Sequence, residues 1–295
     1  MHKLTKAKHT KILDQITLLL NNNNRNIFKW TELWTIFQMN KKAWKVDANV
    51  GYNEFLSFIL ERTNLKEIIF KFPSRTEKRY IWGKPSDYEI LLSLHPKSYF
   101  THLSAVRLNY LRDINSDIYY LNIEQREKLL PNSELSQENI NRAFQNKPRK
   151  TSNIAEFGDK KVYLLNGKYS NMLGVVEVEY ENNKAIRVTD IERTLIDITV
   201  RPVYSGGLSE VLKIFKNSNG KASIDKLIDY LKILDYTYPY HQAIGFYLDK
   251  SEVYPKEKIE ILKKISNPYD FYLGHNMGKE ITYSKEWKLY YPSNI

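Results

Sequence analysis

Apolar residues in the first 65 positions recur at the spacing of amphipathic helices in three segments. The first covers residues 11–20, the second begins at Thr31-Glu32, and the third runs roughly from 50 to 63. The buried positions that this spacing predicts are Ile12, Ile16, Leu19, Leu20, Leu33, Trp34, Phe37, Phe55, Leu56, Ile59 and Leu60. Each segment repeats its apolar residues every three to four positions, so we predict three short helices.

The period changes after the third helix. In residues 65–83 the residues Ile68, Phe70 and Phe72 alternate with Ile69 and Lys71, as in a strand that buries one face. Residues 73–76 (PSRT) carry turn-forming types, and a second alternating run with Tyr80 and Trp82 leads back. We therefore predict a β-hairpin.

Three helices followed by a hairpin are typical of a winged helix-turn-helix, in which the third helix enters the DNA major groove. The segment GKPSD, residues 83–87, is the Pro/Gly/Ser signal before the composition changes. We place a domain boundary there, with a winged helix-turn-helix in residues 1–84 and a second domain in residues 85–295.

The second domain contains both the helical spacing and the strand-like alternation of apolar residues. Residues 95–113 contain Leu103, Val106, Leu108 and Leu111, which predicts a helix, and residues 161–165 and 175–180 alternate as strands. The predicted fold class is α+β, with an N-terminal winged helix-turn-helix followed by a larger mixed α/β C-terminal domain.

Composition narrows the classes of chemistry. The chain of 295 residues has no cysteine, which excludes disulfides, thiolate metal ligands and thiol nucleophiles and favours a cytoplasmic location. The apolar run Ile16–Leu20 is too short for a membrane span or a signal peptide. We expect no membrane partner.

The net charge of +11 is concentrated at the N-terminus. Residues 1–84 hold 16 Lys and Arg against 7 Asp and Glu, which gives 16 − 7 = +9 and leaves +2 for the other residues. A small basic domain indicates a polyanionic partner, and the hairpin favours duplex DNA. The predicted DNA-binding residues are Lys41, Lys42, Lys45, Asn49, Tyr52, Asn53, Arg75, Lys78 and Arg79.

Two patterns allow an enzymatic alternative. His95, His102 and Ser104 lie close in sequence, but no glycine elbow surrounds Ser104, so we interpret it as a small helix residue. Glu177 and Glu179 share one face of a predicted strand, as in metal-dependent nucleases acting on DNA, although the lysine expected at the third position of that motif is replaced by Glu179.

The segment VTDIERTLIDI, residues 188–198, places three carboxylates around one arginine. Thr189 and Glu192 have the spacing of a capping box, and Asp190 suits the positive end of a helix dipole. Arg193 and Asp197 are four residues apart and can pair on one helix face. We therefore assign these charges structural tasks and predict no metal, cofactor or catalytic residue.

Three stretches together resemble the AbiEi-type antitoxins of type IV toxin-antitoxin systems, which are also described as transcriptional regulators of viral defence. They are residues 98–111 (SYFTHLSAVRLNYL), 187–207 (RVTDIERTLIDITVRPVYSGG) and 243–249 (AIGFYLD). The middle stretch is the most specific, because the Glu192-Arg193-Thr194 core, Asp197 and the pair Gly206-Gly207 occur together. At position 109 the family pattern has His-Gly, where this chain has Asn109-Tyr110.

The resemblance implies a DNA-binding repressor that autoregulates its operon. It also implies a C-terminal domain that antagonises a nucleotidyltransferase-like toxin, with or without a stable complex. We expect a non-enzymatic antitoxin for phage defence whose partners are the operator upstream of its own operon and the cognate toxin. The alternatives are a metal-dependent nuclease and a plain winged-helix transcription factor.

Overall fold

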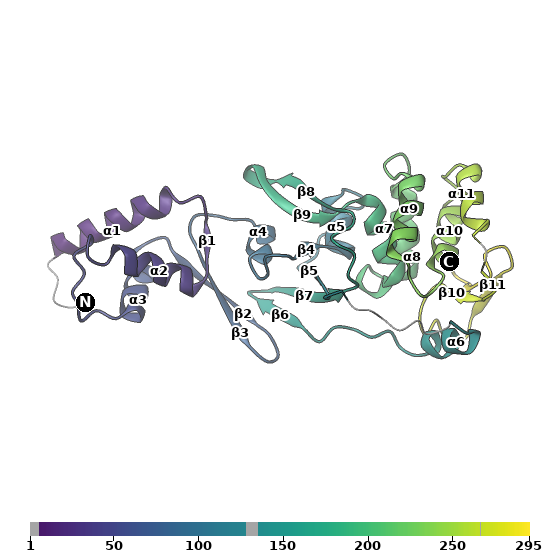
Figure 1. The fold of residues 1–295 in the computed structure, drawn as a ribbon, viewed down its shortest axis with the longest axis horizontal. Coiled ribbons are helices and arrows are strands. Elements are labelled where there is room, and N and C mark those ends of the chain that lie inside the picture. Colours follow the sequence, from purple (N-terminus) through teal and green to yellow (C-terminus); the bar gives the residue numbers. More distant parts are fainter. Residues whose placement is uncertain (1–5, 128–134, 266) are drawn as a thin grey trace. The chain divides into compact units, whose positions relative to one another are not determined.

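The computed structural model describes residues 6–127, 135–265 and 267–295, so the first five residues of the predicted N-terminal domain lie outside it. The chain has a mixed α/β structure and divides into two compact units (Figure 1). One unit holds residues 1–96 and 155–159, and the other holds residues 97–154 and 160–295. The predicted boundary followed residue 84, whereas the first unit extends to Pro96.

The first unit follows the predicted order of helices and hairpin. Its elements are α1 (Lys6–Asn21), β1 (Ile27–Phe28), α2 (Trp30–Asn40), α3 (Tyr52–Arg62), β2 (Lys66–Lys71), β3 (Thr76–Ile81) and α4 (Asp87–Leu92), with β6 (Ile154–Phe157) added from later in the chain. Strands β2 and β3 form the antiparallel hairpin, β1 pairs with β3, and β6 pairs with β2. The interpretation of these elements as a winged helix-turn-helix stays a prediction.

One apolar core holds the helices of the first unit together. Ile12 and Ile16 of α1, Phe37 of α2, and Phe55 and Ile59 of α3 are buried in it. Trp34 was predicted to be buried but is 41% exposed, because the buried face of α2 is formed by Leu33 and Phe37. The predicted period was right, but the buried stripe is narrower than expected.

The segment predicted as a linker contains the start of a helix. Ser86 caps α4, since its hydroxyl accepts from the amide of Glu89 while the Glu89 carboxylate accepts from the amide of Ser86. The residues Gly83 and Pro85 remain a connection, but Asp87 is already helical. The capping box at residues 86–89 was the signal that the sequence analysis missed.

The second unit is built around a sheet with the strand order β7-β5-β4-β9-β8. These strands are β4 (Tyr99–Phe100), β5 (Ile118–Glu124), β7 (Lys160–Gly167), β8 (Val175–Tyr180) and β9 (Lys184–Thr189). Strand β5 is parallel to β7, and β4 is parallel to β9, whereas β8 and β9 form an antiparallel hairpin. The strands predicted at residues 161–165 and 175–180 are confirmed as β7 and β8.

The helix predicted over residues 95–113 is largely wrong. Tyr99 and Phe100 form β4, and the helix α5 is confined to His102–Leu108. Both strand residues are fully buried, and Phe100 pairs with Val188 of β9 and Leu121 of β5. Long-range strand pairing therefore overrides the local helical period.

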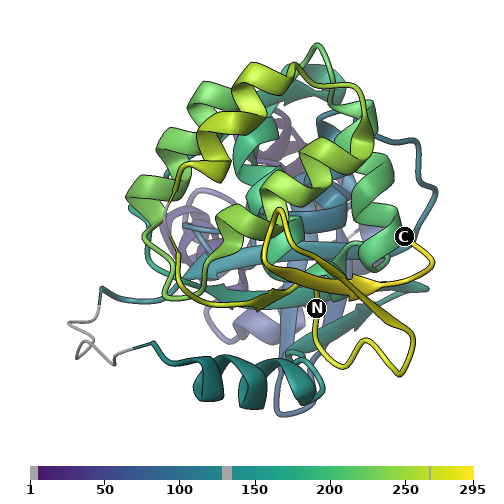
Figure 2. The ribbon, with the colours of Figure 1, turned by 90° about the vertical axis from the view of Figure 1, so that its right-hand side faces the viewer.

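Helices from the C-terminal half pack together in the second unit (Figure 2). The remaining elements are α6 (Gln137–Gln145), α7 (Ile191–Val200), α8 (Leu208–Asn217), α9 (Ile224–Leu234), α10 (Tyr240–Ser251), α11 (Lys256–Lys263), β10 (Phe271–Tyr272), β11 (Ile281–Ser284) and β12 (Leu289–Pro292), with short 3₁₀ turns at Glu181–Asn183 and Pro202–Tyr204. Helix α7 is central, because residues 192–199 are buried on every side. This position brings charged residues of α7 into the core.

Candidate functional site

The connector between α2 and α3 carries three of the predicted DNA-binding lysines. Lys42 and Lys45 are exposed. Lys41 differs, because its ammonium group donates to the carbonyl oxygens of Ala48 and Val50 at 3.0 Å each. Lys41 therefore fixes the connector, and Lys42 and Lys45 remain as solvent-facing cations.

The start of α3 presents two of the three predicted polar contacts. Asn49 and Asn53 are exposed. Tyr52 is buried in the core, its ring lies edge-on to Trp30 at 4.8 Å, and its hydroxyl donates to the Trp30 carbonyl oxygen at 3.2 Å. The prediction that Tyr52 contacts DNA is wrong, because the apolar ring fills space between α2 and α3 and burial raises the pKa of its hydroxyl.

The three hairpin cations predicted to contact DNA differ in their exposure to solvent. The side chains of Arg75 and Lys78 are 43% and 47% exposed and pair with Glu77 at 2.8 Å and Glu67 at 3.0 Å. Arg79 is only 5% exposed, and its guanidinium donates to the carbonyl oxygens of Ser93 and Leu94. The prediction that Arg79 contacts DNA is wrong, because this arginine satisfies carbonyl groups that follow α4.

The helix α7 begins one residue later than the predicted capping box requires. Its N-cap is Asp190, whose side chain accepts from the amide of Arg193 at 2.8 Å. Thr189 is the last residue of β9, and its hydroxyl bonds that of Thr194 at 2.8 Å. The capping role assigned to Thr189 is therefore wrong, because Asp190 supplies the capping oxygen and the Thr189 hydroxyl bonds Thr194 instead.

Glu192 stabilises a different helix. Its carboxylate accepts from the amide of Ser223, just before α9, at 2.7 Å. Lys226 lies 3.0 Å from both Glu192 and Asp190. Burial lowers the pKa of the Lys226 ammonium group, but hydrogen bonds to Glu192 and Asp190 outweigh this and raise it. These charges join the starts of α7 and α9.

Arg193 and Asp197 form the predicted ion pair inside the core. Arg193 Nε lies 2.9 Å from Asp197 Oδ1, and the side chains are 3% and 9% exposed. Burial opposes the positive charge, yet the pKa of the guanidinium is raised because the Asp197 carboxylate favours the charged form. Arg193 Nη1 also donates to the Ser170 hydroxyl and the Leu173 carbonyl oxygen, at 2.9 Å each.

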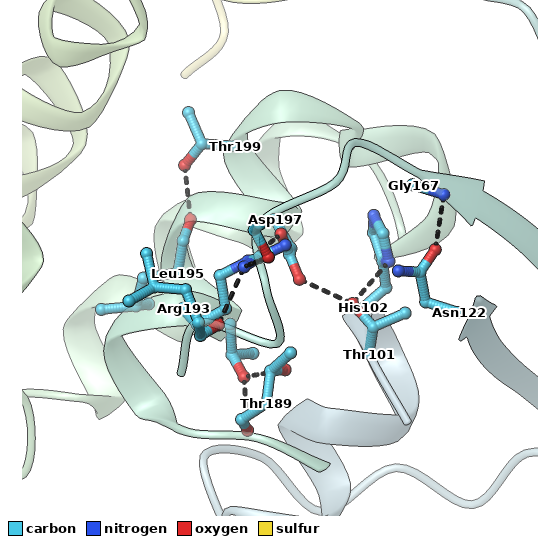
Figure 3. A network of polar contacts seen from close by, with 12 residues as sticks. Thr101, His102, Asn122, Gly167, Thr189, Arg193, Leu195, Asp197 and Thr199 are labelled. Carbon is cyan, nitrogen blue, oxygen red and sulfur yellow. Dashed lines mark hydrogen bonds and ion pairs between the residues drawn. The ribbon is translucent and has the colours of Figure 1, made fainter. Parts of the chain in front are cut away.

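The buried network continues to Thr101 and His102, whose contacts the sequence did not predict (Figure 3). Thr101 donates from its hydroxyl to Asp197 Oδ2 at 2.8 Å, and His102 Nδ1 lies 3.1 Å from the same hydroxyl oxygen. Burial lowers the pKa of the His102 imidazole to about 4, although Asp197 opposes the shift. His102 has φ of 50°, a left-handed conformation that histidine adopts more often than most residues.

The other motif residues have structural contacts. The Ser104 hydroxyl is fully buried and accepts from the amide of Tyr120 at 2.8 Å, which ties α5 to β5. Gly206 and Gly207 have φ of 85° and 92°, values that favour glycine, and Gly207 is the N-cap of α8. Asn109, which replaces the histidine of the family pattern, donates to the Thr189 carbonyl oxygen at the end of β9 at 2.8 Å.

Two cavities of the second unit share Val200 and Arg201 in their walls. The larger has about 850 Å³ and is lined by Lys147, Arg149 and Tyr238 among others. The smaller has about 80 Å³ and is lined by His102 and Arg193 among others. The first is basic and aromatic, and the second borders the buried network.

Glu177 and Glu179, the ligands expected in the nuclease alternative, lie exposed on β8. Within the described ranges no three His, Asp or Glu side chains are grouped as a metal site would need. None of the helices in those ranges combines the length and the apolar character of a membrane crossing.

No protein-family model matches the chain, and no curated protein matches it either. Among solved structures, the fold is similar to that of the RV2827C protein from Mycobacterium tuberculosis. The TM-score is 0.58 over 97% of this chain and 92% of that chain, at 11% sequence identity. At this level of identity the likeness extends to the fold alone.

Proposed function

We propose that residues 1–84 form a winged helix-turn-helix that binds duplex DNA, and that the chain is a non-enzymatic repressor and antitoxin of the AbiEi type. The DNA-binding part rests mainly on one observation: exposed cations follow the connector before α3 and the β2–β3 hairpin. These are the two regions through which this motif contacts DNA.

The connector and the first turn of α3 offer complementary groups. Lys42 and Lys45 supply positive charge for phosphates, and the side-chain amides of Asn49 and Asn53 can donate to and accept from base edges. Glu54 and Glu61 are exposed further along α3 and would repel phosphates. Only the N-terminal turn of α3 therefore enters the groove in our proposal.

The hairpin cations are held by carboxylates but remain available. Exposed ion pairs such as Arg75–Glu77 and Lys78–Glu67 contribute about 0 to 1 kcal/mol. A DNA phosphate can replace either carboxylate at little cost, because the cation keeps a charged partner throughout. Lys71 is exposed opposite Thr76 at the tip and adds to the same charge.

The test measures binding of the full chain to duplex DNA from upstream of its own gene, by fluorescence anisotropy over a range of salt concentrations. A variant with Lys42, Lys45, Arg75 and Lys78 all changed to glutamine removes four cations without altering the core. If each contacts one phosphate, the slope of log K against log salt flattens by about three to four units. Affinity at low salt falls by at least about tenfold.

The control changes Lys250 and Lys256, exposed lysines of the second unit, to glutamine. This variant should keep the wild-type slope. Equal slopes for wild type and the four-residue variant would refute the proposed surface. DNA cleavage with added magnesium or manganese that disappears in Glu177→Ala would instead support the nuclease alternative.

The antitoxin part of the proposal rests on the three resemblance stretches in the second unit. Co-expression with the protein encoded by the neighbouring gene tests it through cell growth. The full chain should restore growth, and so should the four-residue variant, because antagonism is assigned to the second unit. If neither protein restores growth although the wild-type chain binds DNA, the chain is a plain transcription factor.

A further inference from the structure

The smaller cavity of the second unit has a polar wall built from the buried network. The residues that contribute to that wall include Thr101, His102, Arg193, Asp197, Arg201 and Tyr236. Its volume of about 80 Å³ exceeds the roughly 10 to 15 Å³ that one water molecule needs. A group of several non-hydrogen atoms can therefore enter it.

The hydrogen bonds fix the proton on His102. Asp197, as a carboxylate paired with Arg193, can only accept. Thr101 gives its single hydroxyl proton to Asp197 Oδ2, so its oxygen must accept from His102 Nδ1. A neutral imidazole with its proton on Nδ1 carries a free lone pair on Nε2.

His102 Nε2 is shielded from solvent and has no hydrogen-bond partner among the described residues. The residue is only 6% exposed, and Nε2 lies on the side of the ring away from Thr101 (Figure 3). A buried polar atom without a partner costs about 1 to 3 kcal/mol, and a bound water or ion is one of the partners that remove this cost. A ligand for this atom must bring a hydrogen-bond donor.

The remaining wall favours a negative charge. Arg193 bonds through Nε and Nη1, and its Nη2 makes no hydrogen bond within the described ranges. The Arg201 backbone amide donates to the Asp197 carbonyl oxygen, whereas its exposed guanidinium makes no hydrogen bond or ion pair with any described residue. Among the described wall residues Asp197 is the one acid, whereas Lys168, Arg193 and Arg201 are cations.

We infer that the cavity binds a small tetrahedral oxyanion that carries a proton, with hydrogen phosphate as the ion that fits. Its P–OH group donates to His102 Nε2, and its charged oxygens accept from Arg201 and from Arg193 Nη2. The larger basic cavity, which shares Arg201, attracts anions towards the same wall. This inference does not depend on DNA binding by the first unit.

The preference for hydrogen phosphate follows from the single lone pair on His102 Nε2, which can only accept a hydrogen bond. Hydrogen phosphate keeps a P–OH donor near pH 8, whereas sulfate has none. A phosphate monoester has also lost its donor at that pH, because its second pKa is about 6. The cavity should therefore prefer inorganic phosphate to both. A site built from cations alone would bind all three ions alike.

The test is calorimetric titration of the full chain with sodium phosphate, sodium sulfate and methyl phosphate, a monoester without hydroxyl groups, near pH 8 at constant ionic strength. Phosphate should bind saturably with one ion per chain. Sulfate and the monoester should bind about tenfold more weakly, because each leaves Nε2 without a donor. Equal affinity for the three ions, or no saturable phosphate binding, would overturn the inference.

Two variants locate the ion. Arg201→Gln, at an exposed position, should weaken phosphate binding about tenfold without changing the melting temperature. Arg142→Gln, on the exposed face of α6, is the matched control and should bind as wild type. Unchanged binding in Arg201→Gln would contradict the site.

The histidine itself is tested by spectroscopy and by substitution. Nitrogen-15 NMR of the full chain should show the Nδ1–H tautomer for His102, with the Nε2 signal moving when phosphate is added. His102→Asn keeps a residue that tolerates the left-handed backbone and should lose the preference for phosphate over sulfate. A proton found on Nε2 would overturn the assignment even if the variant failed to fold.

Discussion

The two units of the chain treat their charged residues in opposite ways. In the first unit the functional candidates Arg75 and Lys78 lie at the surface, with side chains 43% and 47% exposed. In the second unit the side chains of Arg193 and Asp197, both on α7, are 3% and 9% exposed. Both units contain an arginine–carboxylate pair, but only the pair in the first unit is exposed to water.

The difference decides what each pair can do. An exposed pair is weak and screened, so its cation can exchange one anion for another. A buried pair is costly to break, because removing one partner leaves an uncompensated charge without water. The first arrangement suits contact with a polyanion, and the second fixes the orientation of Thr101 and His102.

The largest effect should come from breaking the buried pair. Arg193→Ala leaves the Asp197 carboxylate uncompensated and should lower the free energy of unfolding by about 3 to 5 kcal/mol. Lys232→Ala, which removes an exposed pair with Asp229 at 3.1 Å, should lower it by less than about 0.5 kcal/mol. Urea unfolding followed by circular dichroism measures both. Similar losses would erase the contrast between buried and exposed pairs.

Acidification should destabilise the second unit through His102. Burial lowers its pKa from 6.5 to about 4, with Asp197, Arg201 and Arg193 as the charged groups around it and the rings of Tyr120 and Tyr204 against it. The unfolded chain therefore binds the proton first. This contribution to stability is complete above about pH 6.5 and is lost as the pH falls towards about 4.

We expect His102 to account for about 2 kcal/mol of lost stability between about pH 7 and pH 5. His102→Asn should show a correspondingly smaller loss in urea unfolding at the two pH values. His241, whose pKa burial also lowers to about 4, contributes equally to both proteins and cancels in the comparison. An identical pH dependence in the variant would show that His102 is not buried as a neutral ring.

A moderate effect is expected at Asp190, the cap of α7. Asp190→Ala removes the acceptor for the Arg193 amide and for the Tyr230 hydroxyl, each at 2.8 Å. The expected cost is about 1 to 2 kcal/mol. Asp190→Asn keeps the capping oxygen and should cost less, again by urea unfolding. Equal costs for the two variants would assign the loss to charge rather than to capping.

The smallest effect on stability is expected at the hairpin. Arg75→Gln and Lys78→Gln should each change the free energy of unfolding by less than about 0.5 kcal/mol, because both cations are exposed. Arg79→Gln in the same strand should cost clearly more, since that guanidinium bonds buried carbonyl groups. Three equal values would show that Arg79 is not held by the residues after α4.

Local patterns in the sequence determined much of the first unit. The spacing of Ile12, Ile16, Phe37, Phe55 and Ile59 predicts the helices, and alternation predicts the β2–β3 hairpin. The four-residue spacing of Arg193 and Asp197 likewise predicts their ion pair, which the structure confirms. Such features depend on neighbours within one or two turns, so the sequence contains the whole of their cause.

Other outcomes were decided only when distant segments came together. Arg79 looks like any hairpin cation until the carbonyl groups of Ser93 and Leu94 surround it. Tyr99 and Phe100 have a helical period but join a sheet, because β5 and β9 supply their hydrogen bonds. A lone sequence gives the choices open to each residue, whereas tertiary packing selects among them.

The sequence alone therefore determined the net charge of the first unit and the apolar spacing that forms its helices. The polar cavity of the second unit was not determined in this way, because Thr101 and Asp197 are 96 positions apart and meet only through folding. Hydrogen bonds have directions that periodicity does not encode. The proton on His102 and the free lone pair beside it follow from that single long-range contact.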